Sequence, residues 1–214
     1  MFRADTGLNG KACCGFLIEA TMDNNLQKPK ILKVETVARS HLFNVEAVDL
    51  EFSNGERRIY ERMRPSGREA VMIVPVIGDE LLLIREYAVG IEQYELGFPK
   101  GLIDPGETVF EAANRELMEE VGFGAERFEL LSTLTMAPSY FSSSMNIVVA
   151  SGLYPKRLQG DEPEPLQLVR WPLANMMSLL KEPDFREARN VSALFLAQQF
   201  LAQPFSAQQD ESST

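Results

Sequence analysis

The sequence predicts an α/β (α+β) fold in which a mixed β-sheet lies between layers of helices. Strand-like runs fill the chain from residue 31 to residue 87. A helix with marked ends follows near residues 108–122, further strands come after it, and two more helices close the sequence after residue 173. Strands first, one helix between strands and helices last are typical of a sheet that is covered on both faces.

Length and composition indicate one domain with short appendages. The 214 residues are 45% apolar and 24% charged, which is typical of globular proteins. We predict a single domain over residues 28–203. The preceding residues 1–27 show no sustained hydrophobic period and are expected to be a disordered leader foreign to the fold, whereas the polar residues 204–214 are expected to form a disordered tail.

Charge and rare residues exclude several classes of function. The formal net charge of −10 argues against a nucleic-acid partner, which requires a basic face. No apolar run reaches the roughly 18 residues of a membrane helix, so no membrane partner is expected. The two cysteines, Cys13 and Cys14, are adjacent and offer no disulfide framework, which favours a reducing, cytoplasmic location. His41 is the single histidine and is expected at the surface, so the general base must be a carboxylate.

The first half of the chain predicts two hairpins. The first alternates with polar residues and turns at Asn54-Gly55, a strong hairpin signal. The second turns at Gly78-Asp79 and is apolar at nearly every position, as expected of strands covered on both faces. The predicted strands are residues 31–37, 42–52, 57–64, 70–77 and 81–87.

Residues 101–123 predict a helix with a defined beginning and end. Thr108 followed by Glu111 forms a capping box, and Gly122 stands where a left-handed residue would end the helix. One apolar face is expected from the residues that recur at three- and four-residue steps, namely Phe110, Ala113, Leu117 and Val121. Pro105 and Gly106 bend the preceding loop, which can bring Glu107 back over the helix and place Arg115 against a carboxylate.

Glu116, Glu119 and Glu120 share a neighbouring face of this helix. Like charges at this spacing cost about 0.2–0.5 kcal/mol per pair, so a helix built only for packing would not gather them. Clusters of carboxylate oxygens suit hard cations, above all Mg²⁺, which shares its coordination with substrate phosphates. We therefore expect Mg²⁺ here, with Mn²⁺ as a substitute: Glu116 and Glu120 reach a shared ion, and Glu119 can hold a second.

The remainder of the chain predicts three strands, an acidic loop and two helices. Residues 160–165 hold Glu162 and Glu164 between prolines that stiffen the backbone. The tail after the last helix is polar. The expected strands are residues 128–136, 145–150 and 168–171, and the expected helices are residues 173–180 and 190–202.

The stretch from Gly101 to Phe123 resembles the complete signature box of the Nudix hydrolases. The matching positions are Gly101, Glu107, Arg115-Glu116-Leu117, Glu119-Glu120 and Gly122. The resemblance implies the Nudix fold, with the outer glutamates as metal ligands and the backbone carbonyl of Lys100 beside them. It also implies that Arg115 orients a glutamate and that Glu107 supports that arginine and the metals.

Features outside the box resemble the ADP-ribose pyrophosphatase branch of this family. Pro138, which lies 16 residues after Gly122, matches the proline that marks the branch. The branch implies a catalytic base from the acidic loop, and we favour Glu164, with Glu162 next. The entry at residues 97–101 instead resembles diadenosine polyphosphate hydrolases. This mixture indicates a pocket that requires an ADP moiety and tolerates different groups attached to it.

Longer runs resemble a bacterial group of these enzymes that hydrolyses ADP compounds. The group cleaves ADP-ribose, NADH and short diadenosine polyphosphates and releases AMP. The resemblance also implies a homodimer formed through the N-terminal antiparallel sheet. We expect Arg85 to contact phosphate or ribose, with Tyr87, Phe98 and Tyr140 as candidate stacking rings. The resembling runs are residues 34–40, 85–90, 94–98, 137–143 and 189–196, within a match covering residues 28–202.

Two alternatives remain open. A Nudix enzyme could act on other nucleoside diphosphate derivatives, although Pro138 argues against this. A non-catalytic Nudix sensor of ADP-ribose would belong to a different class of protein. Sensors usually lose glutamates of the box, and all four are present here.

Overall fold

The computed structural model describes residues 26–64 and 69–202. Apart from residues 26 and 27, the predicted leader lies outside the described residues, as does the tail. The strands are β1 (Lys30–Arg39), β2 (Asn44–Glu51), β3 (Arg57–Arg64), β4 (Ala70–Ile77), β5 (Glu80–Ala88), β6 (Gln93–Gly97), β7 (Lys100–Leu102), β8 (Phe123–Ala137), β9 (Phe141–Pro155) and β10 (Gln167–Pro172). The helices are α1 (Val109–Glu116), the π-helix η1 (Leu117–Val121), the 3₁₀-helix η2 (Leu173–Lys181) and α2 (Ala188–Leu201).

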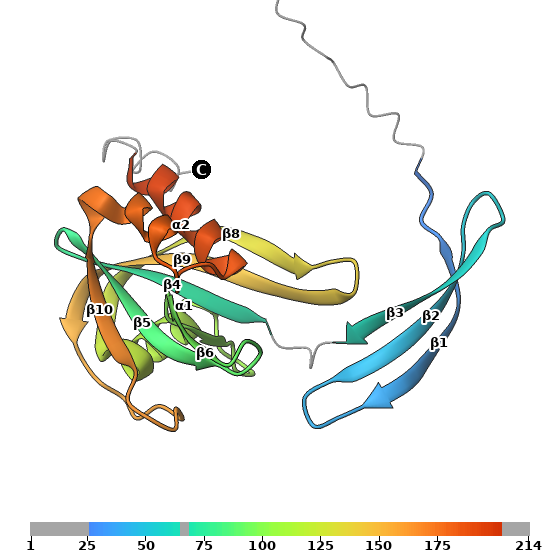
Figure 1. Cartoon of the computed structure of the whole chain (residues 1–214), viewed down its shortest axis with the longest axis horizontal. Coiled ribbons are helices and arrows are strands. Elements are labelled where there is room, and N and C mark those ends of the chain that lie inside the picture. The colour runs from blue at the N-terminus through green and yellow to red at the C-terminus, as the bar shows by residue number, and fades with distance from the viewer. Residues whose placement is uncertain (1–25, 65–68, 203–214) are drawn as a thin grey trace, which may run out of the picture.

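A mixed sheet lies between two layers of helices, which confirms the predicted fold class (Figure 1). Its strands follow the order β1-β2-β3-β9-β4-β5-β10, and β4 pairs with β9 in parallel. Val71 and Ile73 of β4 face α1 and η1, whereas Met72 and Val74 face η2 and α2. Both faces of the central strands are therefore buried, as their continuous apolar sequence requires.

The predicted second hairpin exists only at its turn. β4 and β5 pair at Val76 with Leu81 and at Ile77 with Glu80, and then they separate. Beyond that point β4 pairs with β7 and β9, while β5 pairs with β6 and β10. The separation leaves room beside β5 for β6 and the loop that leads into the signature box.

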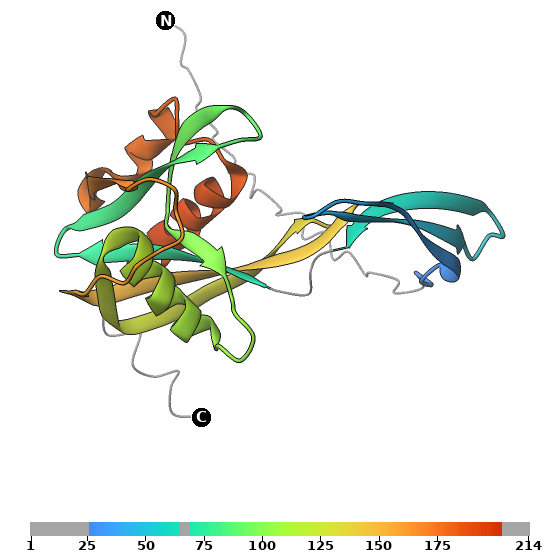
Figure 2. The same ribbon diagram turned by 90° about the horizontal axis from the view of Figure 1, so that it is seen from below.

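Strands β1–β3 form an antiparallel sheet that projects away from the body of the molecule (Figures 1 and 2). The tip of the β8–β9 hairpin meets this sheet, where the backbone N–H of Met63 donates to the carbonyl of Tyr140 at 2.7 Å. His41 is exposed in the turn between β1 and β2, as expected. Large apolar side chains of this sheet and its turns remain exposed, namely Ile31, Val34, Val37, Leu42, Phe43, Ile59 and Tyr60.

Candidate active site

The helix of the signature box, here called the signature helix, consists of α1 followed by η1. It begins as its sequence predicts. The Thr108 side chain accepts a hydrogen bond from the Glu111 backbone N–H, and the Glu111 carboxylate accepts one from the Thr108 N–H. Three of the four predicted apolar residues are buried: Ala113, Leu117 and Val121. Phe110 remains 43% exposed and stacks on Phe128 of β8, with ring centroids 6.0 Å apart.

The second half of this helix is a π-helix, which the sequence pattern did not predict. It covers Leu117–Val121 and ends at Gly122, whose φ of 85° is the left-handed conformation expected of a helix-ending glycine. π-turns are rare and are found mostly at functional sites. Here the wider turn carries Glu119 and Glu120, which changes their direction relative to Glu116 from that of a regular α-helix.

An acidic cavity of about 760 Å³ lies over this helix. Carboxylates reach it from the helix, from β5 and from the loop after β9, so the cavity combines segments that are far apart in the sequence. Its lining residues are Glu86, Lys100, Gly101, Leu102, Asp104, Arg115, Glu116, Glu119, Glu120, Gln159, Gly160, Asp161, Glu162 and Pro163.

Gly101 allows Glu116 to lie against the backbone of β7. A Cβ atom at position 101 would be 2.0 Å from the Glu116 carboxyl group, far inside the contact distance. Any other residue at this position would displace that carboxylate from the cavity. The first glycine of the signature box thus shapes the space in which the Glu116 carboxylate lies.

Arg115 holds the acidic groups in place. Its guanidinium donates to Glu107 through two hydrogen bonds of 2.8 and 2.9 Å, to Glu116 at 2.7 Å and to Glu119 at 3.0 Å. It also donates to the carbonyl of Leu102 at 2.9 Å. The predicted return of Glu107 over the helix is confirmed, and its bonds with Arg115 keep the pKa of Glu107 below its usual value.

Glu120 is the most buried of the helix carboxylates that line the cavity. It is 7% exposed, and it accepts a hydrogen bond from the backbone N–H of Lys100 at 2.9 Å. Burial raises the pKa of Glu120 to about 8, against the opposing effect of Lys100. Burial also raises the pKa of Glu116, to which the negative charges of Glu119 and Glu162 add. Nearby negative charge and lost hydration thus disfavour ionisation of both carboxylates.

These residues fit a hard divalent cation in their chemistry, although they are not yet arranged around one. No set of three His, Cys, Asp or Glu side chains within residues 26–64 and 69–202 has the spacing of a metal site. Arg115 draws Glu116 and Glu119 towards itself, while Lys100 holds Glu120. The donors are all carboxylate oxygens, the type that Mg²⁺ prefers. Rotation of these side chains would be needed to surround an ion.

The two candidate bases in the acidic loop lie in different surroundings. Glu162 lines the cavity, and its charge contributes to the raised pKa of Glu116. Glu164 does not line it, because its carboxylate accepts a hydrogen bond of 2.5 Å from the hydroxyl of Tyr94 on β6. The geometry therefore favours Glu162, the second choice from the sequence.

The first residues of the loop after β9 are hydrogen-bonded to the π-helix. Arg157 donates to the carbonyls of Glu119 and Val121 at 3.4 and 3.3 Å, and the Leu158 N–H donates to the carbonyl of Met118 at 3.1 Å. The cation of Arg157 thus satisfies carbonyls that the end of a helix leaves unpaired. Sequence analysis gave neither Arg157 nor Tyr94 a role in the site, since only the fold brings them to the loop.

The predicted substrate residues are not gathered in the acidic cavity of this chain. Arg85 is held by Asp184 at 2.7 Å and by Gln167 at 3.3 Å. Phe98 is fully buried with its ring against Phe185, so it belongs to the core and is not available for stacking. Pro138 and Tyr140 lie at the tip of the β8–β9 hairpin, and the half-exposed Tyr87 packs its ring edge to face with Tyr94.

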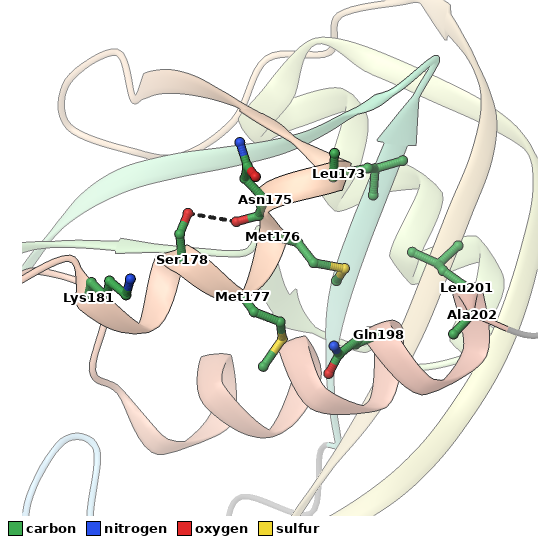
Figure 3. A pocket seen from close by; sticks show the side chains of 10 residues that line it. Leu173, Asn175, Met176, Met177, Ser178, Lys181, Gln198, Leu201 and Ala202 are labelled. Carbon is green, nitrogen blue, oxygen red and sulfur yellow. Dashed lines mark hydrogen bonds between the residues drawn. The ribbon is translucent and has the colours of Figure 1, made fainter.

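Another cavity, of about 690 Å³, lies between η2 and the end of α2 (Figure 3). Its polar side chains are Asn175, Ser178, Lys181 and Gln198, and the Ser178 hydroxyl is bonded to the Asn175 carbonyl at 2.6 Å. Among the residues that the structure describes, no carboxylate lines it. The acidic cavity is therefore the better candidate for chemistry.

Comparison with known families supports the same assignment. The NUDIX domain model matches residues 67–195, which include the acidic cavity. The chain is a Nudix hydrolase. A second model, the NudE-type Nudix hydrolase N-terminal domain, matches residues 29–62.

Individual relatives agree with the family. This Nudix hydrolase is 73% identical over 180 residues to ADP compounds hydrolase NudE of Escherichia coli (strain K12), which covers 84% of this chain and 97% of that protein. It is 23% identical over 172 residues to an ADP-ribose pyrophosphatase of Bacillus subtilis (strain 168), covering 77% of this chain and 92% of that protein. A crystal structure of ADP compounds hydrolase matches with a TM-score of 0.81 at 72% identity, covering 86% of this chain and 97% of that one.

The predicted family and fold are therefore confirmed, and the Nudix hydrolase is an enzyme that acts on pyrophosphate bonds. Within residues 26–64 and 69–202, the structure has no helix with the length and apolar character needed to cross a membrane.

Proposed function

We propose that the protein hydrolyses the pyrophosphate bond of ADP joined to a second group and releases AMP with the help of Mg²⁺. The acidic cavity carries this proposal, because Glu116, Glu120 and Glu162 face it together beside Lys100. The names of the relatives, an ADP compounds hydrolase and an ADP-ribose pyrophosphatase, support the choice of substrate. ADP-ribose, NADH and short diadenosine polyphosphates are the substrates we expect.

The residues of the cavity divide three tasks in the proposed reaction: holding the metal, accepting a proton and orienting the carboxylates. Mg²⁺ would be held by Glu116, Glu119, Glu120 and the Lys100 carbonyl, and when bound it stabilises the charge that develops on the phosphoryl oxygens. Glu162 accepts a proton from the water that attacks phosphorus, while the bond to the bridging oxygen breaks and that oxygen leaves with the other product. Arg115 keeps the carboxylates oriented through its four hydrogen bonds to them. Positioning and charge stabilisation supply most of the acceleration of such reactions.

The substrate range and the metal requirement are tested together. Purified protein is incubated with ADP-ribose, NADH, diadenosine triphosphate and a nucleoside triphosphate, each with Mg²⁺, with Mn²⁺ or with EDTA, and AMP is quantified. We expect AMP from the first three compounds, turnover at least about 100-fold lower in EDTA, and recovery when Mg²⁺ is restored. Tight binding of ADP-ribose with no turnover in Mg²⁺ would instead support a sensor.

We also propose that the protein is a homodimer formed through β1–β3. A three-stranded sheet with exposed Ile59 (71%) and Tyr60 (50%) needs a surface against which to bury its apolar side chains. The match of residues 29–62 to a NudE-type N-terminal domain supports a shared role for this sheet.

Sedimentation velocity checks the dimer. We expect a species of twice the 24.0 kDa chain mass. The double variant Ile59→Glu/Tyr60→Glu, which charges both faces of β3, should sediment as a monomer. Leu180→Glu, which charges an exposed apolar site on η2, should leave the dimer intact. A monomeric wild-type protein at micromolar concentration would contradict the proposal.

A further inference from the structure

A smaller cavity, of about 290 Å³, shares part of its wall with the acidic cavity. Glu86 and Lys100 form an ion pair and line both. The other walls come from β5 and β6, from the residues that directly follow each of them, and from the start of α2 with its N-cap. Its volume is close to the lower end of the roughly 300–1,000 Å³ of typical ligand sites, which is enough for one small ring. The shared wall places the two cavities next to each other.

Glu95 on β6 lines this smaller cavity, and one of its carboxylate oxygens accepts no hydrogen bond from the described residues. It lies opposite Glu86 in the β5–β6 ladder, and its side chain is only 13% exposed. Its Oε1 is shielded from solvent and accepts no hydrogen bond from the described residues. The Nε of Arg186 lies 3.5 Å from the same oxygen, so the charge of Glu95 is balanced while its hydrogen bond is missing. Buried acceptors are nearly always bonded, and an unbonded one is costly.

The other charged side chains of this cavity, and the amide of Asn190, already have partners. Glu187 pairs with Arg189 and accepts hydrogen bonds of 3.0 Å from the backbone N–H and the side-chain amide of Asn190. The Asn190 oxygen in turn accepts from the backbone N–H of Phe98 at 2.8 Å. These contacts fix the cavity wall. Glu95 thus provides an acceptor within a preformed frame.

We propose that this cavity binds a ribose of the nucleotide substrate and that Glu95 accepts a hydrogen bond from a sugar hydroxyl. The inference rests on the proposed function. A neutral donor fits better than a cation, because Arg186 already balances the charge of Glu95. Rotation about the terminal bond of a glutamate is soft, so a carboxylate oxygen can turn towards the ring. Tyr87, which also lines the cavity and is 48% exposed, offers an apolar face for the ring itself.

Either ribose of an ADP-linked substrate supplies this chemistry, and three substrates distinguish them. They are ADP-ribose, the ethyl ester of ADP, which lacks the distal sugar, and ADP-ribose with a 2′,3′-dideoxyadenosine. Glu95→Leu should lower kcat/KM for ADP-ribose about tenfold or more, because one hydrogen bond to a charged group contributes a factor of that size. The loss should come mainly from a higher KM. The loss should vanish on whichever analogue lacks the bound hydroxyls. The melting temperature should not fall, since the substitution removes an unbonded buried acceptor.

Glu129→Leu, the same exchange at an exposed site on β8, serves as the control and should leave all three rates unchanged. If Glu95→Leu does not fold, Glu95→Gln is measured against the same substrates and should show a smaller loss with the same selectivity. An equal loss of kcat/KM on all three substrates, or no loss on any of them, would overturn the ribose site. The proposed function would still stand in that case, provided that the wild type releases AMP from ADP-ribose. If the wild type cleaves the pyrophosphate bond of none of them, the proposed function fails and this inference fails with it.

Discussion

Glu120→Gln should lower kcat for AMP release by a factor of about 100–1,000 or more while the protein remains folded. The substitution keeps the size of the side chain and removes a charged oxygen ligand from the proposed metal site. Loss of one group that stabilises transition-state charge typically costs a factor of this order. The measurement is kcat on ADP-ribose at saturating Mg²⁺, so that a weaker affinity for the ion does not account for the result.

The stability of this variant provides the check on folding. Burial raises the pKa of Glu120 to about 8, so the native protein binds a proton more tightly than the unfolded chain. The ionised carboxylate therefore reduces stability as the pH rises from about 4.5 towards 8, and a neutral glutamine avoids this cost. Without metal at pH 8, the melting temperature of Glu120→Gln should equal or exceed that of the wild type. Glu129→Gln, on an exposed part of β8, is the control and should change neither kcat nor the melting temperature. A kcat within threefold of wild type for Glu120→Gln would show that Glu120 is not part of the metal site.

Glu162→Gln should lower kcat by a factor of about 100–10,000, whereas Glu164→Gln should lower it less than tenfold. General-base catalysis contributes an acceleration of the larger size. Glu162 lines the acidic cavity, and Glu164 is held outside it by the hydroxyl of Tyr94. Both variants are compared at saturating Mg²⁺ and saturating ADP-ribose. The two glutamates stand in the same proline-stiffened loop, so each variant is the natural control for the other.

The opposite order would show that the loop rearranges when substrate binds, releasing Glu164 from Tyr94. Tyr94→Phe distinguishes this case, since it removes the hydrogen bond and should then raise the activity that depends on Glu164. If both glutamine variants retain full activity, the base does not come from this loop. Glu119, which lines the cavity and is otherwise proposed to hold metal, would be the next candidate.

Local sequence determined where the signature helix begins and ends and which charged groups it carries. The capping pair at Thr108, the end at Gly122 and the return of Glu107 to Arg115 all depend on residues within one short segment. The apolar runs of β4 and β5 likewise required a sheet covered on both faces, whatever their partners. For these features, the interactions that decide the structure occur between residues close together in the chain.

Tertiary structure decided which distant groups share the cavity. Nothing local distinguishes Glu162 from Glu164; the contact of Tyr94 with one of them does. Nor does a pattern of apolar residues show that the strand after Gly78 separates from its hairpin partner, or that the signature helix widens into a π-turn at Leu117. The spacing of glutamates along the sequence shows how many carboxylates share one face of a helix. Burial, and with it the raised pKa of Glu120, depends on how β7 and the loop after β9 close over that helix, because lost hydration is a property of the packed structure.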